Sequence, residues 1–576
     1  MSTTAPIKLD TRNLKKASGK RKGRITDARS REEIKALLGN ESRQRDLLIE
    51  HLHKIQDRYG HISAGHIVAL AEEMKLAMTE VYEVATFYHH FDVIKEGDKA
   101  PPEITVRVCD SLSCELAGAK NLFHALQQQA GNNVRVITAP CVGRCESAPV
   151  AVVGQNPIDR ADFARVQLAL TRKAVKAPVA PYIDYRQYRE QGGYRTLVEC
   201  VSGKRQKEDV IKTLEDSALR GLGGAGFPAG RKWRIVRAEP APRLMAINID
   251  EGEPGTFKDR WYLERDPHRF LEGMLIAAWA VGIDEIYIYL RDEYAGCRQI
   301  LEKELIALQP DPPCQLPKIY LRRGAGAYIC GEESAMIESI EGKRGMPRLR
   351  PPYLAQVGLF NRPTLEHNME TLHWVRDILE KGAAWFSAQG RNGRKGLRSF
   401  SVSGRIQKPG VHLAPAGITM RELVDEYCGG MLPGHTFYAY LPGGASGGIL
   451  PASMGDIPLD FDTLNPHGCF IGSAAVMILS DQDRARDAAV NVMRFFEDES
   501  CGKCTPCRVG TSKAVKLMQE KRWNRELLEE LSTAMADASI CGLGQAAPNP
   551  IRCVLKYFSH EVTTHPQARH DKGSAF

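Results

Sequence analysis

Four cysteines near the C-terminus are the residues best suited to chemistry. Cys501, Cys504 and Cys507 follow C-x2-C-x2-C spacing in the segment ESCGKCTPCRVG, and Cys541 stands later in SICGLG. This spacing places three thiolates in one tight loop, and a distant fourth can complete the cage of a 4Fe-4S cluster. Zinc is usually held by two separated cysteine pairs. The pattern therefore favours a 4Fe-4S cluster over zinc or unligated thiols.

A second set of four cysteines lies in the first third of the chain. Cys109 and Cys114 have C-x4-C spacing, and Cys141 and Cys145 have C-x3-C spacing. Because Cys109 and Cys141 each follow a strand-like segment, the four thiolates should meet at one edge of a sheet. They could hold a 2Fe-2S cluster, although the spacing alone leaves zinc and unligated thiols open. The other seven cysteines stand singly, and we interpret them as small buried apolar residues.

A glycine-rich loop offers a place for a nucleotide. Gly221, Gly223 and Gly226 in RGLGGAGF match the pattern G-x-G-x-x-G. In a Rossmann fold this pattern follows a strand and opens a helix, whereas here the helix-like segment 208–219 precedes it. The pattern therefore does not predict a Rossmann fold. Its glycines still allow a phosphate or a planar ring to approach the backbone, with Lys232 as a counter-charge.

Two further motifs concentrate acids and amides beside glycines. They are NIDEGEPGTFKD at 248–259 and YICGEES at 328–334. Carboxylates can accept hydrogen bonds from ribose hydroxyls, and Asn can bond the edge of a flavin ring. Each acid taken singly is better explained as a solvated surface residue. Together with the glycine loop, these motifs favour a pocket for a nucleotide cofactor.

The periodicity of apolar residues indicates which elements position these motifs. Helical spacing between 42 and 90 predicts a small helical bundle, and strand-like segments at 103–109, 133–139 and 148–153 predict a thioredoxin-like α/β layer. We expect six segments: a basic flexible tail at 1–40, the bundle and thioredoxin-like domain at 41–172, a linker at 173–204, an α/β domain at 205–398, a strand-rich domain at 399–482 and a helical bundle at 483–576.

Composition restricts the class of protein. A chain of 576 residues exceeds one hydrophobic core, so several domains are expected. The longest apolar stretch, near 274–283, is too short to cross a bilayer, and 15 cysteines without an export signal favour a reducing, cytoplasmic location. The net charge of +8 is carried by residues 1–31, where ten Lys and Arg stand against two Asp. We interpret this segment as a flexible tail and expect no nucleic-acid partner.

Taken in order, four motifs resemble a known family. These are RGLGGAGFPAGRKW, NIDEGEPGTFKD, GAGAYICGEESAMIESIEGKRGMPR and ESCGKCTPCRVG. Over about 205–560 the chain is similar to the NADH-binding, FMN-containing subunit of respiratory complex I and its soluble relatives. The first 170 residues, with HLHKIQDRYGHIS and ATFYHHFDV, resemble the thioredoxin-like 2Fe-2S subunit beside it. The resemblance implies a 2Fe-2S cluster on the N-terminal cysteines, a β-grasp fold at 399–482 and a 4Fe-4S cluster in the last bundle.

The resemblance also implies which residues hold the nucleotides. NAD(H) would stack over the flavin, with Phe227 as a platform, Glu253 and Glu333 as hydrogen-bond acceptors and Tyr353 near the adenine. The residues implied for FMN are Gly221, Gly223, Gly224, Ala225, Gly226, Lys232, Asn248, Asp250, Glu251, Gly331, Glu332, Asn368 and Thr371. No catalytic acid or base is implied, because the flavin exchanges hydride directly with nicotinamide. The family commonly has Asn where this chain has His367, whose role stays open.

Fusion of the two units in one chain narrows the resemblance to soluble formate dehydrogenases and NAD-reducing hydrogenases. The segment 428–461 looks most like the beta subunit of the molybdenum- or tungsten-dependent, NAD-linked formate dehydrogenase, and the N-terminal cysteine set is complete. We expect a diaphorase subunit that passes electrons from a catalytic alpha subunit, with its molybdenum or tungsten cofactor and further clusters, to NAD+. The alternatives are a hydrogenase diaphorase, a complex I module and a non-enzymatic cluster-binding scaffold without flavin.

Overall fold

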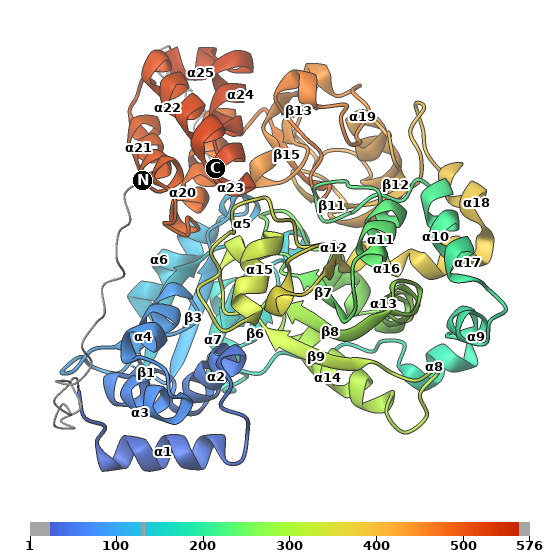
Figure 1. Ribbon diagram of the computed structural model, residues 1–576. Coiled ribbons are helices and arrows are strands. Elements are labelled where there is room, and N and C mark those ends of the chain that lie inside the picture. The colour runs from blue at the N-terminus through green and yellow to red at the C-terminus, as the bar shows by residue number, and fades with distance from the viewer. Residues whose placement is uncertain (1–23, 130, 132, 564–576) are drawn as a thin grey trace, which may run out of the picture.

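The computed structural model describes residues 24–129, 131 and 133–563, and Figure 1 shows how its elements are arranged. The N-terminal bundle, blue in Figure 1, consists of α1 (Ala28–Leu38), α2 (Leu48–Tyr59), α3 (Ala64–Met74) and α4 (Met78–Phe87). A short parallel pair, β1 (Ile62–Ser63) and β2 (Val93–Ile94), accompanies this bundle. The helical bundle predicted from periodicity is therefore found.

The basic tail predicted for 1–40 is wrong in its last part, because α1 lies within it. The helix begins after Asp27, whose side chain accepts a hydrogen bond from the backbone N–H of Ser30 at 2.8 Å. Ile34 and Leu38 are buried, and α1 packs on α3. An amphipathic helix with several exposed charges is easily mistaken for a disordered basic segment. The rest of the predicted tail, residues 1–23, lies outside the described residues.

Residues 104–171 form the predicted thioredoxin-like layer. Its sheet has the order β4-β3-β5-β6. The strands are β3 (Ile104–Cys109), β4 (Val134–Ala139), β5 (Ala151–Val153) and β6 (Asn156–Ile158), and the helices are α5 (Leu112–Leu116), α6 (Ala119–Gln129) and α7 (Phe163–Thr171). Strands β3 and β4 run parallel, with Cys109 paired to Ala139. Their carboxyl ends therefore bring the two N-terminal cysteine pairs to one edge of the sheet.

The linker predicted at 173–204 is wrong beyond residue 184, where two short helices form. These are α8 (Tyr185–Glu190) and α9 (Arg195–Val201). The Tyr188 hydroxyl and the Tyr194 backbone N–H both donate to Glu272 Oε2, at 2.7 and 2.9 Å. Leu197 is fully buried, and α9 packs on α13 (Pro267–Val281). Each helix is too short to show a clear helical period of apolar residues in the sequence. Its burial depends on α13, which lies far along the chain.

Four parallel strands form the central sheet of the α/β domain, in the order β10-β7-β8-β9. They are β7 (Arg243–Ile249), β8 (Ile283–Leu290), β9 (Lys318–Arg323) and β10 (Thr364–Asn368). The surrounding helices include α10 (Lys207–Asp216), α11 (Ala229–Ala238), α12 (Lys258–Leu263), α13, α14 (Ala295–Ala307), α15 (Glu333–Ile340), α16 (Met369–His373), α17 (Val375–Lys381) and α18 (Ala383–Ser387). Ligands of open α/β sheets bind beyond the carboxyl ends of the strands. Segments 250–253, 324–331 and 368–371 all lie there.

A five-stranded mixed sheet follows, in the order β12-β11-β15-β13-β14. Its strands are β11 (Leu397–Gly404), β12 (Gly410–Pro415), β13 (Phe437–Leu441), β14 (Leu450–Pro451) and β15 (Ala475–Ser480), and α19 (Met420–Glu422) lies between β12 and β13. The first and last strands, β11 and β15, run parallel to each other, and the other pairings are antiparallel. This is the expected β-grasp arrangement.

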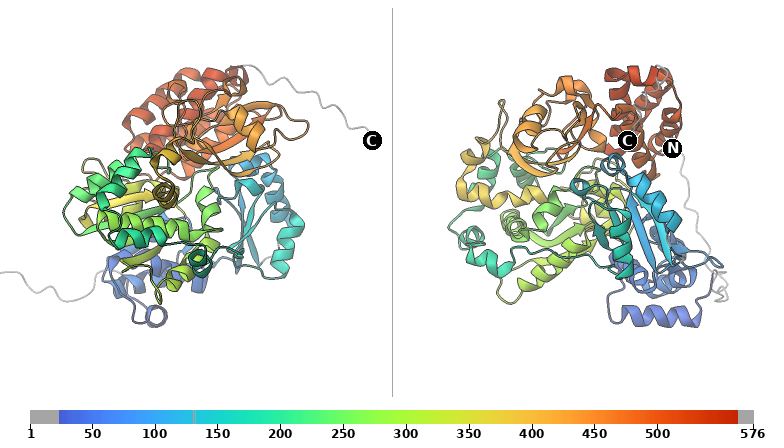
Figure 2. Two further views of the ribbon diagram at one scale, coloured as in Figure 1. Left: turned by 90° about the vertical axis from the view of Figure 1, so that its right-hand side faces the viewer. Right: turned by 180° about the vertical axis from the view of Figure 1, so that it is seen from behind.

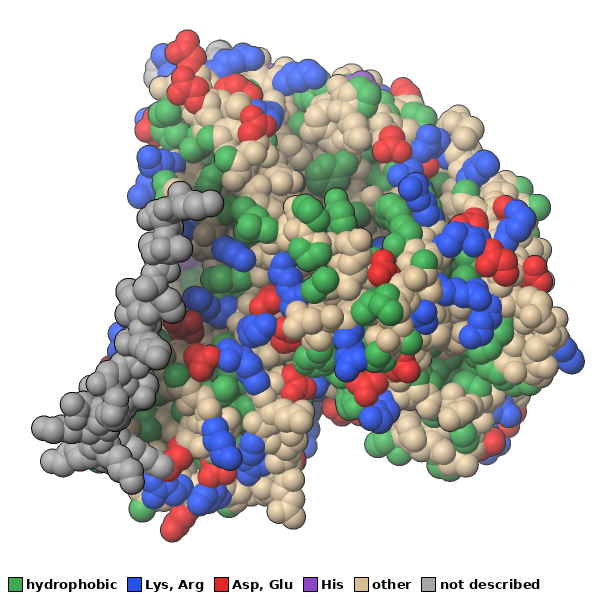
Figure 3. All heavy atoms as spheres, viewed as in Figure 1, with side chains coloured by type: hydrophobic (Ala, Val, Ile, Leu, Met, Phe, Trp, Pro, Cys, Tyr) green, Lys and Arg blue, Asp and Glu red, His purple; other side chains and the backbone are tan. Residues whose placement is uncertain are grey.

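The C-terminal unit contains α20 (Ala485–Asp498), α21 (Thr505–Gln519), α22 (Arg525–Ala538), α23 (Gly542–Ala546), α24 (Asn549–Tyr557) and α25 (His560–Thr563). Figures 1 and 2 show these helices beside the β-grasp strands, and the two units share one apolar core. Within the described residues, none of the helices combines the length and the apolar character needed to span a bilayer. On the face drawn in Figure 3, basic and acidic side chains are interspersed.

We predict that Ile34→Ala destabilises the N-terminal bundle by about 3 kcal/mol, because it leaves a cavity at a fully buried position of α1. Hydrogen exchange of the α1 amides should become faster. The control Glu32→Ala changes an exposed residue of the same helix and should have little effect. Equal exchange rates in the two variants would mean that α1 is not anchored by this side chain.

Candidate functional site

The glycine loop joins α10 to α11, so it connects two helices and does not follow a strand. Its ends are closed by a hydrogen bond from the Gly221 N–H to the Phe227 carbonyl at 2.8 Å. Gly224 (φ 133°) and Gly226 (φ 66°) adopt backbone conformations that side chains disfavour. A Cβ at Gly226 would lie 2.6 Å from the Phe461 ring. The loop is therefore a shallow backbone cradle that only small residues can form.

The cradle rests on the junction between β10 and α16. The Leu222 N–H donates to Thr371 Oγ1 at 2.9 Å. A Cβ at Gly223 would lie 2.9 Å from Asn368 Cβ, so glycine is needed for this approach. Ala225 is exposed at the tip of the loop. The structure thus brings together the glycine loop, Asn368 and Thr371, which the sequence places far apart.

The floor of the site comes from the end of β7 and the segment that follows β9. Asn248 Nδ2 donates to the Gly331 carbonyl at 2.9 Å. Asp250 Oδ2 is buried without a hydrogen-bond partner in the described structure, and burial holds the pKa of Asp250 well above its usual value. Lys232 Nζ lies 2.9 Å from Glu366 Oε2. A glycine cradle, a buried polar atom without a partner and a nearby ammonium group fit a flavin mononucleotide.

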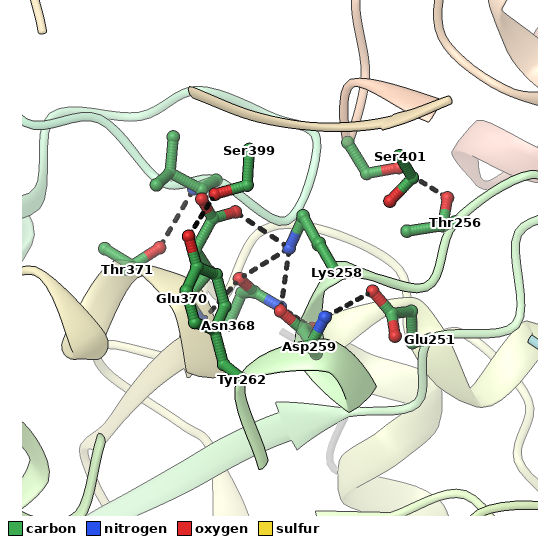
Figure 4. A network of polar contacts seen from close by, with 12 residues as sticks. Glu251, Thr256, Lys258, Asp259, Tyr262, Asn368, Glu370, Thr371, Ser399 and Ser401 are labelled. Atoms are coloured by element: carbon green, nitrogen blue, oxygen red, sulfur yellow. Dashed lines mark hydrogen bonds and ion pairs between the residues drawn. The ribbon is translucent and has the colours of Figure 1, made fainter. Parts of the chain in front are cut away.

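A buried ion-pair network that the sequence did not predict supports this floor (Figure 4). Lys258 Nζ lies 2.8 Å from Asp259 Oδ1 and 3.0 Å from Glu370 Oε2. Asn368 Nδ2 donates to Asp259 Oδ2 at 2.6 Å. Burial alone would lower the pKa of Lys258, but Asp259 and Glu370 raise it, so the residue stays charged. The Lys258 network therefore fixes Asn368 beneath the glycine loop.

Two acids predicted around the flavin have protein partners in the structure. The first, Glu251, accepts hydrogen bonds from the Asp259 N–H at 2.8 Å, the Arg260 N–H at 3.2 Å and the Tyr294 hydroxyl at 2.7 Å. Burial and the neighbouring Asp259 raise the pKa of Glu251 to about 7. Its carboxyl group is therefore occupied at the start of α12.

Glu332 is the second of these acids. It caps α15, where its carboxylate accepts from the Ser334 and Ala335 N–H groups at 3.1 and 3.0 Å. The carboxylates of Glu251 and Glu332 therefore stabilise the starts of α12 and α15.

The residues predicted for nicotinamide nucleotide have neighbours of their own. Glu253 Oε1 accepts from the Ser446 N–H and hydroxyl at 2.8 and 2.7 Å, and the Tyr328 hydroxyl donates to Glu253 Oε2. Burial raises the pKa of Glu253. Glu333 lies 3.0 Å from the Arg350 guanidinium. Both acids are thus held in place by contacts within the chain.

The two aromatic residues predicted for the nucleotide are open to solvent. Phe227 is 39% exposed and Tyr353 is 57% exposed. Both are therefore accessible to a ligand approaching from outside.

The four N-terminal cysteines converge and are buried. Cys141 Sγ and Cys145 Sγ are 3.4 Å apart, and the Cys109 thiol contacts those of Cys114 and Cys141. Contacts with the Cys109 and Cys145 thiols hold the pKa of Cys141 well below its usual value. The described residues at this sheet edge thus present four sulfurs to one point, as a 2Fe-2S cluster requires.

The C-terminal cysteines also come together. Cys504 precedes α21 and Cys541 precedes α23. Burial raises the pKa of Cys507 to about 11, with added repulsion from Cys504 and Cys501. Burial likewise raises the pKa of Cys541 to about 12, and Cys501 contributes to this shift. A metal bound here would hold these thiols as thiolates despite their burial, because a coordinating thiol is deprotonated.

Some residues lie in arrangements that the sequence did not indicate. Cys469 and Cys553 are buried in the apolar core, as predicted for the cysteines outside the two sets, but their sulfurs also lie 3.5 Å apart, a contact that the sequence did not indicate. His367 is buried and accepts a hydrogen bond from Trp233 Nε1 at 2.8 Å, and burial lowers its pKa well below the usual value. His367 therefore supports the strand under the site as a neutral side chain.

Another group of metal-ligating residue types, His53, His90 and Asp292, joins α2 to the end of β8. His90 Nδ1 lies 2.5 Å from one Asp292 oxygen, and Arg323 lies 2.5 Å from the other. The carboxylate is thus already paired with two neighbouring side chains. We interpret the group as an ion-pair network that fastens the N-terminal bundle to the α/β domain.

Three family models match the chain. The Nuo51 FMN-binding domain matches residues 214–377, the thioredoxin-like 2Fe-2S ferredoxin matches 34–173, and the NADH-ubiquinone oxidoreductase-F iron-sulfur binding region matches 487–565. The FMN, 2Fe-2S and 4Fe-4S assignments predicted from the motifs are therefore confirmed.

Curated relatives match about two thirds of the chain. An NADH-quinone oxidoreductase subunit of Rhizobium meliloti (strain 1021) is 40% identical over 397 residues, which are 66% of this chain and 94% of that protein. The corresponding protein of Aquifex aeolicus (strain VF5) is 39% identical over 419 residues, 69% of this chain and 95% of that protein. In a crystal structure of H2-reduced NAD+-reducing NiFe-hydrogenase, a chain matches with TM-score 0.79 and 31% identity, covering 91% of this chain and 94% of that one.

We predict that Lys258→Met destabilises the flavin-binding domain by about 3–5 kcal/mol, because Asp259 and Glu370 would stay buried without their counter-charge. The midpoint of urea-induced flavin release should fall accordingly. Lys212→Met is the matched control, since Lys212 pairs with Asp216 at an exposed position. If both variants release flavin at the same urea concentration, the Lys258 network does not support the site.

Proposed function

Because this chain belongs to the family of NADH-quinone oxidoreductase subunits with the Nuo51 FMN-binding domain, we propose that it is the diaphorase subunit of a multi-subunit NAD-linked dehydrogenase. Electrons from a catalytic partner subunit would pass through this chain to NAD+, and the reverse direction is equally open. The favoured partner is a formate-oxidising alpha subunit with molybdenum or tungsten, on the strength of segment 428–461 and the complete N-terminal cysteine set.

One observation carries the electron-transfer proposal: hydrogen bonds link both cysteine sets to the acid-rich segments at 248–259 and 328–334. On one side, Arg291 donates to the carbonyls of Glu251 and Cys141, at 2.5 and 2.7 Å. On the other side, Glu499, two residues before Cys501, accepts from the Tyr328 N–H at 2.9 Å. A cluster-binding scaffold without NAD chemistry would not need a nucleotide site linked to both sets of sulfur ligands.

The chain's own residues would bind and orient the reactants. A bound flavin supplies the chemistry that connects two-electron hydride transfer with one-electron iron-sulfur clusters. Glycine backbone at 221–226 admits its planar ring, Lys232 offers positive charge, and Glu253 and Glu333 can accept hydrogen bonds from a nucleotide. The exposed ring of Phe227 is available to stack on a base or nicotinamide.

A hydrogenase diaphorase is the second candidate. It is supported by the match to the NAD+-reducing hydrogenase chain, which extends over 91% of this chain and so includes the fused ferredoxin unit. The complex should be purified from its source and assayed with formate and with H2 as the reductant of NAD+. Molybdenum or tungsten with formate activity supports the first candidate, and nickel with H2 activity supports the second. An isolated chain without flavin absorbance would point to the scaffold.

We predict that Glu333→Lys weakens NADH use while FMN stays bound. The variant removes an acceptor and adds positive charge beside Arg350 and Lys232. The expected cost is about 2 kcal/mol, or roughly thirtyfold in kcat/KM for NADH with a dye acceptor. Glu333→Gln should have a smaller effect in the same direction, and the distant exposed Glu526→Lys should have none. Unchanged kcat/KM for NADH in Glu333→Lys would show that Glu333 does not contribute to nucleotide binding.

We predict that Cys541→Ser damages the 4Fe-4S cluster and spares NADH oxidation by a dye that accepts electrons from the flavin. A serine oxygen is a poorer ligand for iron than thiolate, so the cluster should become labile or change its potential. Turnover coupled to the catalytic partner should fall steeply. Cys314→Ser, at a single half-buried cysteine, serves as the control. Full coupled activity with an unaltered 4Fe-4S paramagnetic signal would show that Cys541 is not a ligand.

A further inference from the structure

The loop that carries Cys141 and Cys145 is held by side chains of the α/β domain. Arg260 Nε donates to the Gly143 carbonyl at 2.8 Å. A Cβ at Gly143, where φ is 68°, would lie 2.3 Å from the Tyr294 hydroxyl oxygen. Docking on the α/β domain therefore holds the loop in shape, and glycine is required at the point of closest approach.

Arg291 is the residue that touches both this loop and the flavin side. It follows β8 directly and is 4% exposed. One terminal nitrogen donates to the Cys141 carbonyl at 2.7 Å and the other to the Glu251 carbonyl at 2.5 Å. Nε lies 3.1 Å from a Glu293 carboxylate oxygen. All three guanidinium nitrogens are thus used, in a planar fork that only arginine provides.

The guanidinium carries a permanent charge in a place with little water. Burial alone would lower the pKa of Arg291, but Glu293 and Tyr294 raise it well above its usual value. Glu293 is partly exposed, with 26% of its side chain accessible, so solvent screens Glu293 more than it screens Arg291. The positive charge next to the Cys141 carbonyl is therefore paired directly with Glu293, and it also interacts with the carboxyl groups of Asp250 and Glu499, whose pKa values burial raises.

We propose that Arg291 is a positioning residue that locks the Cys141–Cys145 loop onto the flavin-binding domain and raises the reduction potential of the 2Fe-2S cluster. Reduction adds one negative charge to the cluster, and a buried cation beside the ligand loop stabilises the reduced form. Hydrogen bonds and charges around the first ligands are known levers on such potentials. The inference rests on the proposed function, which makes Cys141 a cluster ligand.

The test is a redox titration of the full chain with its flavin and clusters, followed by the 2Fe-2S paramagnetic signal. In Arg291→Gln, the equilibrium constant for cluster reduction should fall about tenfold, which is about 59 mV for a one-electron couple. Arg291→Lys keeps the charge without the fork, so its potential should lie closer to that of the native chain. The 4Fe-4S potential in the same sample should stay unchanged.

Two further variants keep the test decisive. Glu293→Gln removes the compensating carboxylate and should shift the potential in the opposite, positive direction, even if Arg291→Gln does not fold. Arg322→Gln is the matched control, because Arg322 is 5% exposed and pairs with Asp46 and Glu50, away from both cysteine sets. Arg322→Gln should not change the reduction potential of the 2Fe-2S cluster.

The possible outcomes distinguish a failure of the role proposed for Arg291 from a failure of the proposed 2Fe-2S site. An intact cluster with the native potential in Arg291→Gln, or no shift in Glu293→Gln, would overturn the role of Arg291 and leave the ligand assignment standing. Cys141→Ser tests that assignment directly. If Cys141→Ser keeps the native 2Fe-2S signal, Cys141 is not a ligand and the proposed 2Fe-2S site itself fails.

Discussion

The site depends on one buried ammonium group, that of Lys258. Water cannot screen it at 1% exposure, so it must be paired, and its partners come from two segments that are far apart in sequence. Asp259 lies next to it in α12, whereas Glu370 lies in α16. Asn368, bonded to Asp259, is in turn the contact surface for the glycine loop. Correct pairing of one charge therefore positions α12, α16 and the glycine loop relative to one another.

The same principle governs how the N-terminal units meet the α/β domain. The contacts between them are rich in arginine, with Arg260 and Arg291 on the ferredoxin loop and Arg322 and Arg323 on the helical bundle. Ion pairs of this kind add little net stability, because desolvation offsets most of the attraction, but they penalise any misaligned docking. Buried apolar residues of the helical bundle and of the α/β domain also belong to one cluster, so this interface is not held by ion pairs alone. The arginine contacts fix its geometry, and the apolar packing supplies binding energy.

The parts of the site that could be predicted from sequence are those with local geometry. The spacing of Cys501, Cys504 and Cys507 constrains one loop, and the glycine pattern constrains another, so both could be interpreted without a partner. Contacts between residues far apart in sequence could not be predicted. The sequence around Lys258 does not indicate Glu370 as its partner, and the sequence around Cys469 does not indicate Cys553. The capping roles of Glu251 and Glu332 could not be predicted either, because the sequence pattern of a carboxylate beside a glycine is the same whether the side chain binds a ligand or caps a helix.

The raised pKa values of the acids explain how a phosphate-bearing cofactor can lie among carboxyl groups. Burial holds the pKa of Asp250 well above its usual value, raises that of Glu253, and with Asp259 brings that of Glu251 to about 7. With a pKa of about 7, the Glu251 carboxyl is partly protonated at neutral pH, so its negative charge is reduced. Repulsion of an anionic ligand is reduced accordingly, and a protonated carboxyl can donate as well as accept. The acid-rich motifs, which by charge alone would oppose a nucleotide, thereby become compatible with one.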